Sequence, residues 1–392
     1  MINQLHVVAD ISITGGGQAS ASFHLAGNIS EQYGKVGLWH RHKDGRSLAD
    51  GISCDHPLKL FRYAGPAGLF NSYKCLRSML AAIDSTDAKV VHLHGMWFPM
   101  YRIAYQAAKL RDTAVVMSPH GCMTKWDLNR KWLKKQIALA VYQRKILEGV
   151  DMFFASARDE AEGIRLLGLV QPIAIVPNGV EIPAVQIMRE KSESEEKTLL
   201  FMGRIHPTKG LLDLVEAWKH VRRVGWRLRI VGPATTADEI SYRKLVVDKI
   251  SEYGLEREVD LPGMVEGDRK KAEFESADIF ISPTYSENFG IVTAEALSYG
   301  LPAITTTGAP WGELIDHHCG WWVAPGVDGI AGAIRDALDT APDELTAMGK
   351  SGRELILRKY SWMKIASDCL DAYRWVLDTT HPRPACLYNE NR

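Results

Sequence analysis

The strongest constraint on the fold is a regular alternation of strand-like and helix-like segments along all 392 residues. Short apolar runs rich in β-branched residues alternate with segments of helical period, which is typical of βα units in a parallel sheet. The expected strands of the first half are residues 5–11, 89–93, 114–118, 152–155 and 173–176. Those of the second half are residues 199–203, 227–231, 259–261, 279–283 and 302–306. The sequence therefore predicts an α/β protein built on parallel sheets.

A charge-dense stretch around residues 183–197 separates the two halves and has almost nothing to bury. The chain is also too long for one typical core. We therefore expect an N-terminal domain, a linker, a C-terminal domain, a last helix and a frayed tail. Their expected bounds are residues 1–183, 184–197, 198–359, 360–380 and 381–392. Two similar α/β halves with one polar linker predict a cleft that can hold a two-part substrate.

Composition limits the classes of partner. Lys plus Arg equals Asp plus Glu at 47 each, so no overall field draws the chain to nucleic acid. Six cysteines lie scattered without C-x-x-C spacing, which favours thiols in a reducing compartment. No apolar run approaches the about 18 residues that span a bilayer, and the first residues do not have the pattern of a signal peptide. We expect a cytoplasmic protein, with contact at the inner face of the membrane left open.

The stretch from Glu287 to Glu295 carries most of the functional information. A strand-like run enters a loop rich in Ser, Glu, Asn and Gly, and a helix-period segment then carries Glu295 about two turns in. In an α/β domain this is where ligands bind, with the free N–H groups of residues 290–292 in the same crevice. Alone, the two carboxylates could form an acid/base pair of the hydrolase kind. Their loop and helix settings favour separate roles in binding sugar hydroxyls, beside amides that can hold a phosphate.

Two cations share another predicted strand-to-helix loop. Arg204 and Lys209 lie between Gly203 and Gly210, just before an amphipathic helix. A guanidinium fork and an ammonium beside a helix N-terminus form a good diphosphate site. Two solvated loop charges are the alternative. The neighbouring carboxylate segment favours the diphosphate site.

A run of three glycines follows the first expected strand and precedes a helix-like segment. Gly15, Gly16 and Gly17 would let backbone amides approach a phosphate or a sugar ring. The run is not the G-x-G-x-x-G pattern of dinucleotide binding, and a plain turn is the alternative.

Three histidines lie on or directly after expected strands of the first half. His120 follows one strand, whereas His92 and His94 alternate on another and point to one face. A metal would need a third ligand, and the chain contains no H-x-x-x-H or H-E-x-x-H motif. We therefore predict no metal site, a hydrogen-bonded structural role for His92 and His94, and an active-site role for His120.

The segment 123–145 is basic and contains aromatic anchors. Its tryptophans and clustered cations are Trp126, Trp132, Lys125, Arg130, Lys131, Lys134 and Lys135. Such a helix can lie on anionic lipid and would suit a lipid-linked acceptor. A surface helix with a core-facing side is the alternative.

Together these motifs resemble the family 4 glycosyltransferases, also called group 1, over nearly the whole chain. The matching segments are residues 15–17, 118–121, 175–181, 203–210, 231–233, 261–265, 287–295 and 300–302. The resemblance implies the GT-B fold, in which two Rossmann-like parallel-sheet domains face a central cleft. It also implies transfer of a sugar from a nucleotide donor with retention of anomeric configuration, without a cofactor.

The resemblance implies a role for each donor-binding group. Glu295 would take the ribose hydroxyls, and Glu287 would take hydroxyls of the donor sugar with help from nearby amides. Arg204 and Lys209 would hold the diphosphate. The implied donor-binding residues are Gly15, Gly16, Gly17, Gly203, Arg204, Lys209, Met264, Val265, Glu287, Asn288, Phe289, Gly290, Ile291 and Glu295.

Four further residues complete the implied assignments. Met264 and Val265 would border the base, Gly16 would approach the phosphate, and His120 would approach the transferred sugar. The final helix would cross back onto the first domain. The loop reads Ser-Pro-His-Gly where many relatives have His followed by an acidic residue. The implied catalytic set is His120, Arg204, Lys209 and Glu287.

The predicted function is a metal-independent retaining glycosyltransferase that uses a UDP- or GDP-sugar. Its acceptor would be a sugar or a lipid-linked sugar, in surface polysaccharide or lipid-linked oligosaccharide synthesis. A nucleotide-sugar epimerase and a phosphorylase remain alternatives, although no convincing pyridoxal-phosphate lysine site is present. A non-catalytic sugar or nucleotide-binding module is the alternative from another class, and it would not need the central charges that this chain retains.

Overall fold

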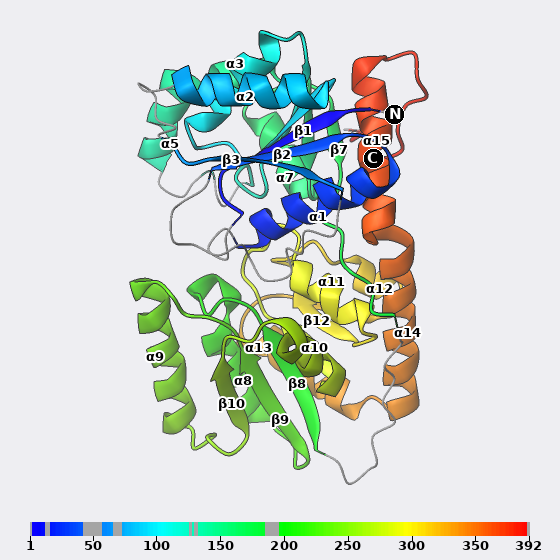
Figure 1. Ribbon diagram of the computed structural model, residues 1–392. Helices are drawn as coiled ribbons and strands as arrows, with labels where there is room; N and C mark the ends of the chain where they lie inside the picture. Colours follow the sequence, from blue (N-terminus) through cyan, green and yellow to red (C-terminus); the bar gives the residue numbers. More distant parts are fainter. Residues whose placement is uncertain are drawn as a thin grey trace. The chain divides into compact units, whose positions relative to one another are not determined.

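The chain forms two compact α/β units (Figure 1). The computed structural model describes residues 2–11, 16–41, 57–65, 73–124, 128, 132–184 and 196–389. Unit 1 comprises Met1–Gly179 and Trp362–Arg392, and unit 2 comprises Val180–Ser361. Residues 185–195 of the expected linker lie outside the described residues.

Unit 1 is built on a parallel sheet which, in the described part of the chain, has seven strands in the order β3-β2-β1-β4-β5-β6-β7. These strands are β1 (Gln4–Val8), β2 (Val36–Arg41), β3 (Lys59–Tyr63), β4 (Val90–His94), β5 (Ala114–Ser118), β6 (Met152–Ala155) and β7 (Ile173–Ile175). The helical segments of this unit are α1 (Gly16–Gln32), α2 (Tyr73–Thr86), α3 (Met100–Lys109), α5 (Trp132–Ala138), η2 (Leu139–Gln143), α6 (Arg144–Gly149), α7 (Arg158–Leu166) and α15 (Trp362–Leu377). The central strands β1, β4 and β5 are buried along almost their whole length, as is typical of parallel strands with helices on both faces of the sheet.

The last helix of the chain belongs to the core of unit 1. Figure 1 shows α15 beside α1, and Cys369 and Tyr373 of α15 are buried in the same apolar cluster as Phe23 of α1. The chain after α15 is not frayed over residues 386–388. Leu387 pairs with Ala174 in β7, and the Cys386 carbonyl accepts a 2.7 Å hydrogen bond from a β7 amide.

Unit 2 is built on a parallel sheet with six strands among the described residues, in the order β10-β9-β8-β11-β12-β13. The strands are β8 (Lys197–Met202), β9 (Trp226–Val231), β10 (Val259–Gly263), β11 (Ile279–Ser282), β12 (Ala303–Thr306) and β13 (Gly320–Val323). The helical segments are η3 (Pro207–Lys209), α8 (Leu211–Val221), α9 (Ala237–Glu252), α10 (Gly267–Ser276), α11 (Ile291–Ser298), α12 (Glu313–Asp316), α13 (Val327–Asp339) and α14 (Pro342–Lys359). The predicted α/β class with parallel sheets is confirmed.

Two sequence expectations concern the whole chain. The described cysteines, Cys75, Cys122, Cys319, Cys369 and Cys386, are free thiols, whereas Cys54 lies outside the described residues. In the described part of the chain, no helix combines the length and the apolar character needed to cross a membrane.

Close backbone packing joins α14 to the turn after α11. A Cβ atom added at Gly349 in α14 would stand 1.9 Å from the carbonyl oxygen of Gly300. Gly332, inside α13, has nothing within 4 Å of its added Cβ atom. The same glycine-to-alanine change therefore meets opposite surroundings at two helical positions of one unit.

We predict opposite effects of these two substitutions on stability. Gly349→Ala should lower the free energy of unfolding of unit 2 by about 1–3 kcal/mol, because the methyl group forces two backbones apart. Gly332→Ala should raise it by about 0.5–1 kcal/mol, because alanine loses less conformational entropy in a helix. Urea unfolding measures both values. Equal effects of the two changes would contradict the close contact at Gly349.

Candidate functional site

The loops after β8 and β11 are tied together at the carboxyl edge of the unit 2 sheet. The Thr208 carbonyl accepts hydrogen bonds from the Tyr285 amide at 2.8 Å and from the Thr284 hydroxyl at 2.9 Å. The Thr208 amide in turn donates to Nδ1 of His206 at 3.2 Å, which caps the short helical turn η3. One carbonyl therefore fixes the relative position of the two loops that carry the predicted donor groups.

Lys209 and Glu287 form an ion pair across these loops. The Lys209 ammonium contacts Oε2 of Glu287, and the two side chains are only 17% and 23% exposed. Oε1 of Glu287 accepts from the Asn288 amide at 3.2 Å. Gly210 makes the approach possible, because its φ is +66° and a Cβ atom there would stand 2.2 Å from the Pro283 oxygen. The structure thus brings two of the predicted site residues into direct contact.

The N-terminus of α11 opens beside Glu287. Gly290 is its N-cap residue with a left-handed φ of +79°. The first amides of a helix have no acceptor within the helix, so those of Gly290, Ile291 and Val292 are available to a ligand at its positive end. Trp311 Nε1 donates to the Phe289 carbonyl at 2.6 Å and holds this turn in place.

Glu295 presents a carboxylate oxygen without a partner. Its Oε1 accepts from the Lys270 ammonium at 2.6 Å, whereas Oε2 is buried and has no hydrogen bond to any described residue. A buried acceptor without a donor costs about 1–3 kcal/mol, so this oxygen is suited to receive a hydroxyl from a ligand. Lys270 was not predicted as the partner of Glu295.

Arg204 is largely exposed, at 66% of its side chain. Its Nη1 lies 3.2 Å from Oε1 of Glu239, at the start of α9. Burial would raise the pKa of Glu239, but hydrogen bonds from Thr235 and Thr236 together with Arg204 hold it below its usual value. Arg204 is thus anchored on one side by a carboxylate, and its other N–H groups remain available.

A cavity of about 560 Å³ lies at the ends of β9 and β10. Met264 lines this cavity and is half exposed. Val265 is partly buried and packs against an apolar cluster that includes Val231 and Phe289. The other lining residues are Gly232, Pro233, Ala234, Thr235, Ile240, Arg243, Lys244, Val247 and Gly263. Of the two residues predicted to border a base, the structure therefore places only Met264 on the cavity wall. Arg243 and Lys244 were not predicted.

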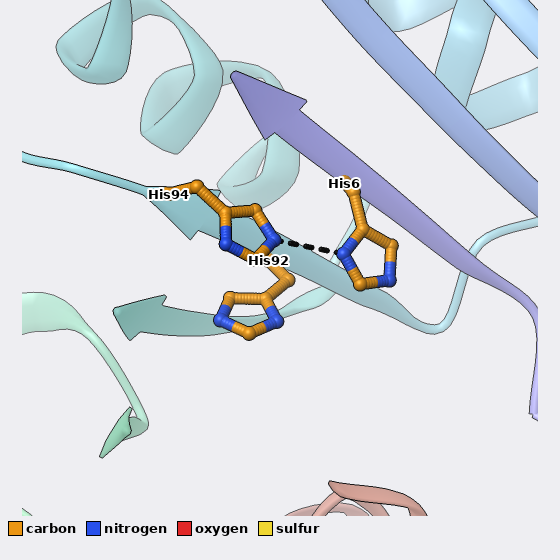
Figure 2. Close-up of side chains that lie close together, drawn as sticks. All are labelled: His6, His92 and His94. Atoms are coloured by element: carbon orange, nitrogen blue, oxygen red, sulfur yellow. Dashed lines mark hydrogen bonds between the residues drawn. The ribbon is translucent and has the colours of Figure 1, made fainter. Parts of the chain in front are cut away.

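In unit 1 a chain of buried histidines leads to His120. Nδ1 of His94 lies 3.0 Å from Nε2 of His120, and Nε2 of His94 lies 2.8 Å from Nδ1 of His6. Nε2 of His6 in turn lies 3.2 Å from the Gln4 side-chain oxygen. Figure 2 shows the His6–His94 bond, with His92 beside it. His6 was missed because it lies on β1, which the sheet places beside β4 with His6 opposite His92.

His92 and His94 are both buried and hydrogen-bonded, as predicted. Nδ1 of His92 lies 2.6 Å from the Tyr373 hydroxyl, and its Nε2 lies 2.7 Å from the Ser118 hydroxyl. Nitrogens of His6, His92 and His94 lie within 4.8 Å of one another, a grouping that could hold a metal ion. Hydrogen bonds already account for both nitrogens of each of these rings, and a metal would have to displace some of them.

Hydrogen bonds to Glu160 hold the loop that carries His120 in place. This buried carboxylate accepts from the Gly121 amide, and also from the Ser156 amide at 3.0 Å and its hydroxyl at 2.9 Å. His120 itself is half-buried and has a left-handed φ of +55°, which is uncommon for a residue with a side chain. In this conformation Nε2 of His120 reaches Nδ1 of His94. Glu160 was not predicted from the sequence.

The buried histidines His6, His92 and His94 and the half-buried His120 are neutral at pH 7. Burial lowers the pKa of His6 to about 3 and that of His120 to about 4. Burial, together with repulsion from neighbouring imidazoles, holds the pKa values of His92 and His94 well below the usual range. The edge of unit 1 therefore presents uncharged hydrogen-bonding groups.

The predicted glycine run and basic segment lie partly outside the described residues. Gly15 lies outside the described residues, and Gly16 and Gly17 open α1. In the basic segment, Lys125, Trp126, Arg130 and Lys131 also lie outside them. Lys135 is described, and its ammonium lies 5.4 Å from the ring centre of Trp97.

Family models cover both halves of the chain. Residues 185–355 match the model described as glycosyl transferases group 1, and residues 15–182 match the model described as glycosyltransferase family 4. The chain belongs to the group 1, or family 4, glycosyltransferases, as its motifs predicted.

The chain is similar to the GDP-mannose:cellobiosyl-diphosphopolyprenol alpha-mannosyltransferase of Xanthomonas oryzae, with 25% identity over 84% of this chain and 83% of that protein. The glycogen synthase of Mycobacterium tuberculosis is 25% identical over 72% and 68%. The match to an uncharacterized glycosyltransferase of Methanocaldococcus jannaschii, 29% identical, spans about half of each chain, 47% of both.

Solved structures confirm the GT-B fold. Sucrose-phosphate synthase from Thermosynechococcus elongatus is 19% identical and covers 97% of this chain and 100% of its own, with a TM-score of 0.73. Anabaena Alr3699/HepE, solved with UDP and glucose, is 14% identical and covers 95% and 100%, with a TM-score of 0.74. At these identities the likeness shows the fold, two parallel-sheet α/β domains.

The neutral histidines predict a loss of stability in mild acid. Their folded-state pKa values are depressed, so below the unfolded value of about 6.5 the unfolded chain binds more protons. Each of the buried rings of His6, His92 and His94 should therefore remove about 1.4 kcal/mol per pH unit from the free energy of unfolding between pH 6.5 and 5. Denaturant unfolding at several pH values measures the slope.

A pair of variants isolates this contribution. His6→Gln should make the slope shallower by about 1.4 kcal/mol per pH unit, whatever its effect on stability at pH 7. His381→Gln, which removes an exposed imidazole, should leave the slope unchanged. The account of the histidine cluster fails if both variants keep the wild-type slope.

Proposed function

We propose that the protein is a retaining glycosyltransferase that moves a sugar from a UDP- or GDP-sugar to an acceptor hydroxyl. The observation that carries the proposal is the arrangement at the carboxyl edge of the unit 2 sheet. There the Lys209–Glu287 ion pair lies beside the open amides of α11, and Glu295 offers a buried oxygen without a partner. Cations, amides and carboxylate acceptors in one place match a diphosphate with a sugar on either side.

In this proposal each part of the donor meets a group of matching chemistry. The ribose hydroxyls donate to Oε2 of Glu295, and hydroxyls of the transferred sugar donate to Glu287. The base occupies the cavity that Met264 lines. Lys209, Arg204 and the amides of residues 290–292 hold the diphosphate, because cations and a helix N-terminus both favour negative charge.

The same groups account for catalysis. Breaking the anomeric C–O bond leaves positive charge on the sugar ring and additional negative charge on the departing diphosphate. Lys209 and Arg204 are already held in place by Glu287 and Glu239, so they can stabilise this charge without reorganising. Such stabilisation contributes on the order of a few kcal/mol per group.

Retention of configuration follows from attack on the face that the leaving group departs from. A double displacement would need a carboxylate positioned under the anomeric carbon. Glu287 is engaged by Lys209 and by the Asn288 amide, which suits a binding role. We therefore propose same-face attack by the acceptor hydroxyl, with His120 contacting the transferred sugar.

The acceptor is proposed to be a sugar or a lipid-linked sugar in surface polysaccharide or lipid-linked oligosaccharide synthesis. The relative from Xanthomonas oryzae is named for a diphosphopolyprenol acceptor, and this supports the lipid-linked form. The protein would then be cytoplasmic, and residues 123–145 would contact the anionic inner face of the membrane. Flotation with anionic liposomes at low salt tests this contact, and protein that stays unbound excludes it.

Removal of either cation should impair turnover. Lys209→Ala or Arg204→Ala should lower kcat/KM by about 100-fold or more, because each removes charge that stabilises the leaving group. Lys271→Ala is the matched control, since this exposed lysine pairs only locally with Asp268, three residues away in α10. Steady-state kinetics with the cognate nucleotide-sugar measures the effect. Near wild-type turnover of the Lys209 and Arg204 variants would reject the assignment.

Activity should not require a divalent metal. If protein cations and amides stabilise the diphosphate, the transfer rate in excess EDTA should equal the rate without it. A rate lost in chelator and restored by Mn²⁺ or Mg²⁺ would overturn the metal-independent mechanism.

A further inference from the structure

We propose that Gln4, His6 and His94 are positioning residues that fix the tautomer of His120, so that its Nδ1 is unprotonated and accepts a hydroxyl of the transferred sugar. The proposal stands on the unbroken chain of hydrogen bonds from β1 through β4 to the loop after β5. Only its naming of a sugar hydroxyl rests on the proposed function.

The direction of the chain follows from Gln4. A neutral imidazole has one N–H donor and one lone-pair acceptor. The Gln4 oxygen can only accept, so Nε2 of His6 must carry its proton and Nδ1 of His6 must accept. Nε2 of His94 then donates to His6, which leaves Nδ1 of His94 as an acceptor for Nε2–H of His120. The proton of His120 is thereby placed on Nε2.

The orientation of the Gln4 amide is set by its other contact. Its Nε2 lies 3.5 Å from the carbonyl oxygen of Ile2, an acceptor, and this turns the side-chain oxygen toward His6. The reverse orientation would present a donor to His6 and invert the tautomers of all three rings. Gln4, His6 and His94 are fully buried, so water does not compete for these bonds.

The hydrogen-bonded imidazoles are not readily protonated. Burial keeps the imidazoles neutral near pH 7, and the rings of His6 and His94 stack with their centres 5.1 Å apart. The His94 carbonyl accepts from the Gln18 amide at 2.7 Å and from the Tyr101 hydroxyl, which hold the end of β4 in place. The chain is therefore rigid as well as neutral.

Nδ1 of His120 is the last atom in this chain of hydrogen bonds. It has no hydrogen bond to any residue that the structure describes, and Glu160 fixes the loop that carries it. An unprotonated Nδ1 accepts from a hydroxyl but cannot donate to a carbonyl or a carboxylate. The site therefore selects a sugar that offers a hydroxyl at this point.

NMR of ¹⁵N-histidine-labelled protein without ligand tests the tautomers directly, since two-bond ¹⁵N–¹H correlations distinguish Nε2–H from Nδ1–H. The rings are assigned with single histidine substitutions. The expected result is Nε2–H for His6, His94 and His120. Nδ1–H on His120 would overturn the proposal, as would stoichiometric metal bound to the purified protein and lost in His6→Gln.

A matched pair of variants tests the coupling. Gln4→Met keeps the volume but removes the acceptor, so His120 should become a mixture of tautomers and kcat/KM should fall by about 10-fold. Ser118→Ala removes a bond to His92, outside the chain, and should leave the His120 tautomer unchanged. An unchanged tautomer in Gln4→Met would contradict the coupling.

Two further outcomes separate this proposal from the function on which it rests. A shifted tautomer with wild-type kcat/KM in Gln4→Met would show that His120 does not accept from the sugar. Absence of any sugar transfer by the wild-type protein would overturn the proposed function, while the NMR spectra would still decide the tautomer assignment.

Discussion

The Lys209–Glu287 ion pair is the interaction on which the site in unit 2 depends. It joins the loop after β8 to the loop after β11, and both side chains are largely removed from water. Desolvation offsets much of the Coulombic gain of such a pair, so its contribution to stability is small. Its value is geometric, because it holds an ammonium and a carboxylate in fixed positions before a ligand arrives. The supporting contacts, the shared Thr208 carbonyl and the glycine at position 210, serve the same purpose.

The two units differ in the chemistry of the side chains at the edges of their sheets. The edge of unit 2 is charged, and Arg204, Lys209 and Lys270 are each anchored by a carboxylate. The edge of unit 1 ends a chain of hydrogen-bonded imidazoles whose lowered pKa values keep them neutral at pH 7. A charged edge suits the diphosphate of a nucleotide-sugar. A neutral edge with a fixed acceptor suits sugar hydroxyls, which need direction more than field strength.

Patterns of neighbouring residues predicted most of the strands and the two strand-to-helix loops of unit 2. The expected strands correspond to β1 and β4–β12, and the loops of Lys209 and Glu287 were located because strand, turn and helix follow directly along the chain. Three strands were not among those expected: β2 and β13 contain glycine, and β3 is a half-polar edge strand. The partners His6, Glu160, Glu239 and Lys270 were missed because sheet register and loop packing bring them to the site from distant parts of the sequence. The frayed tail was predicted from its polar composition, yet backbone bonds to β7 order residues 386–388.

The central claim is that Lys209 binds the diphosphate while its partner Glu287 binds the transferred sugar. Calorimetric titration of UDP, GDP and the matching nucleotide-sugars into wild type, Lys209→Ala and Glu287→Gln tests it most directly. The account predicts that Lys209→Ala weakens binding of the nucleoside diphosphate and the nucleotide-sugar alike. Glu287→Gln should weaken binding of the nucleotide-sugar more than that of the nucleoside diphosphate, because it removes the carboxylate acceptor for the sugar, whereas the glutamine side-chain oxygen can still accept from the Lys209 ammonium. Equal weakening of both ligands by Glu287→Gln would contradict the division of roles.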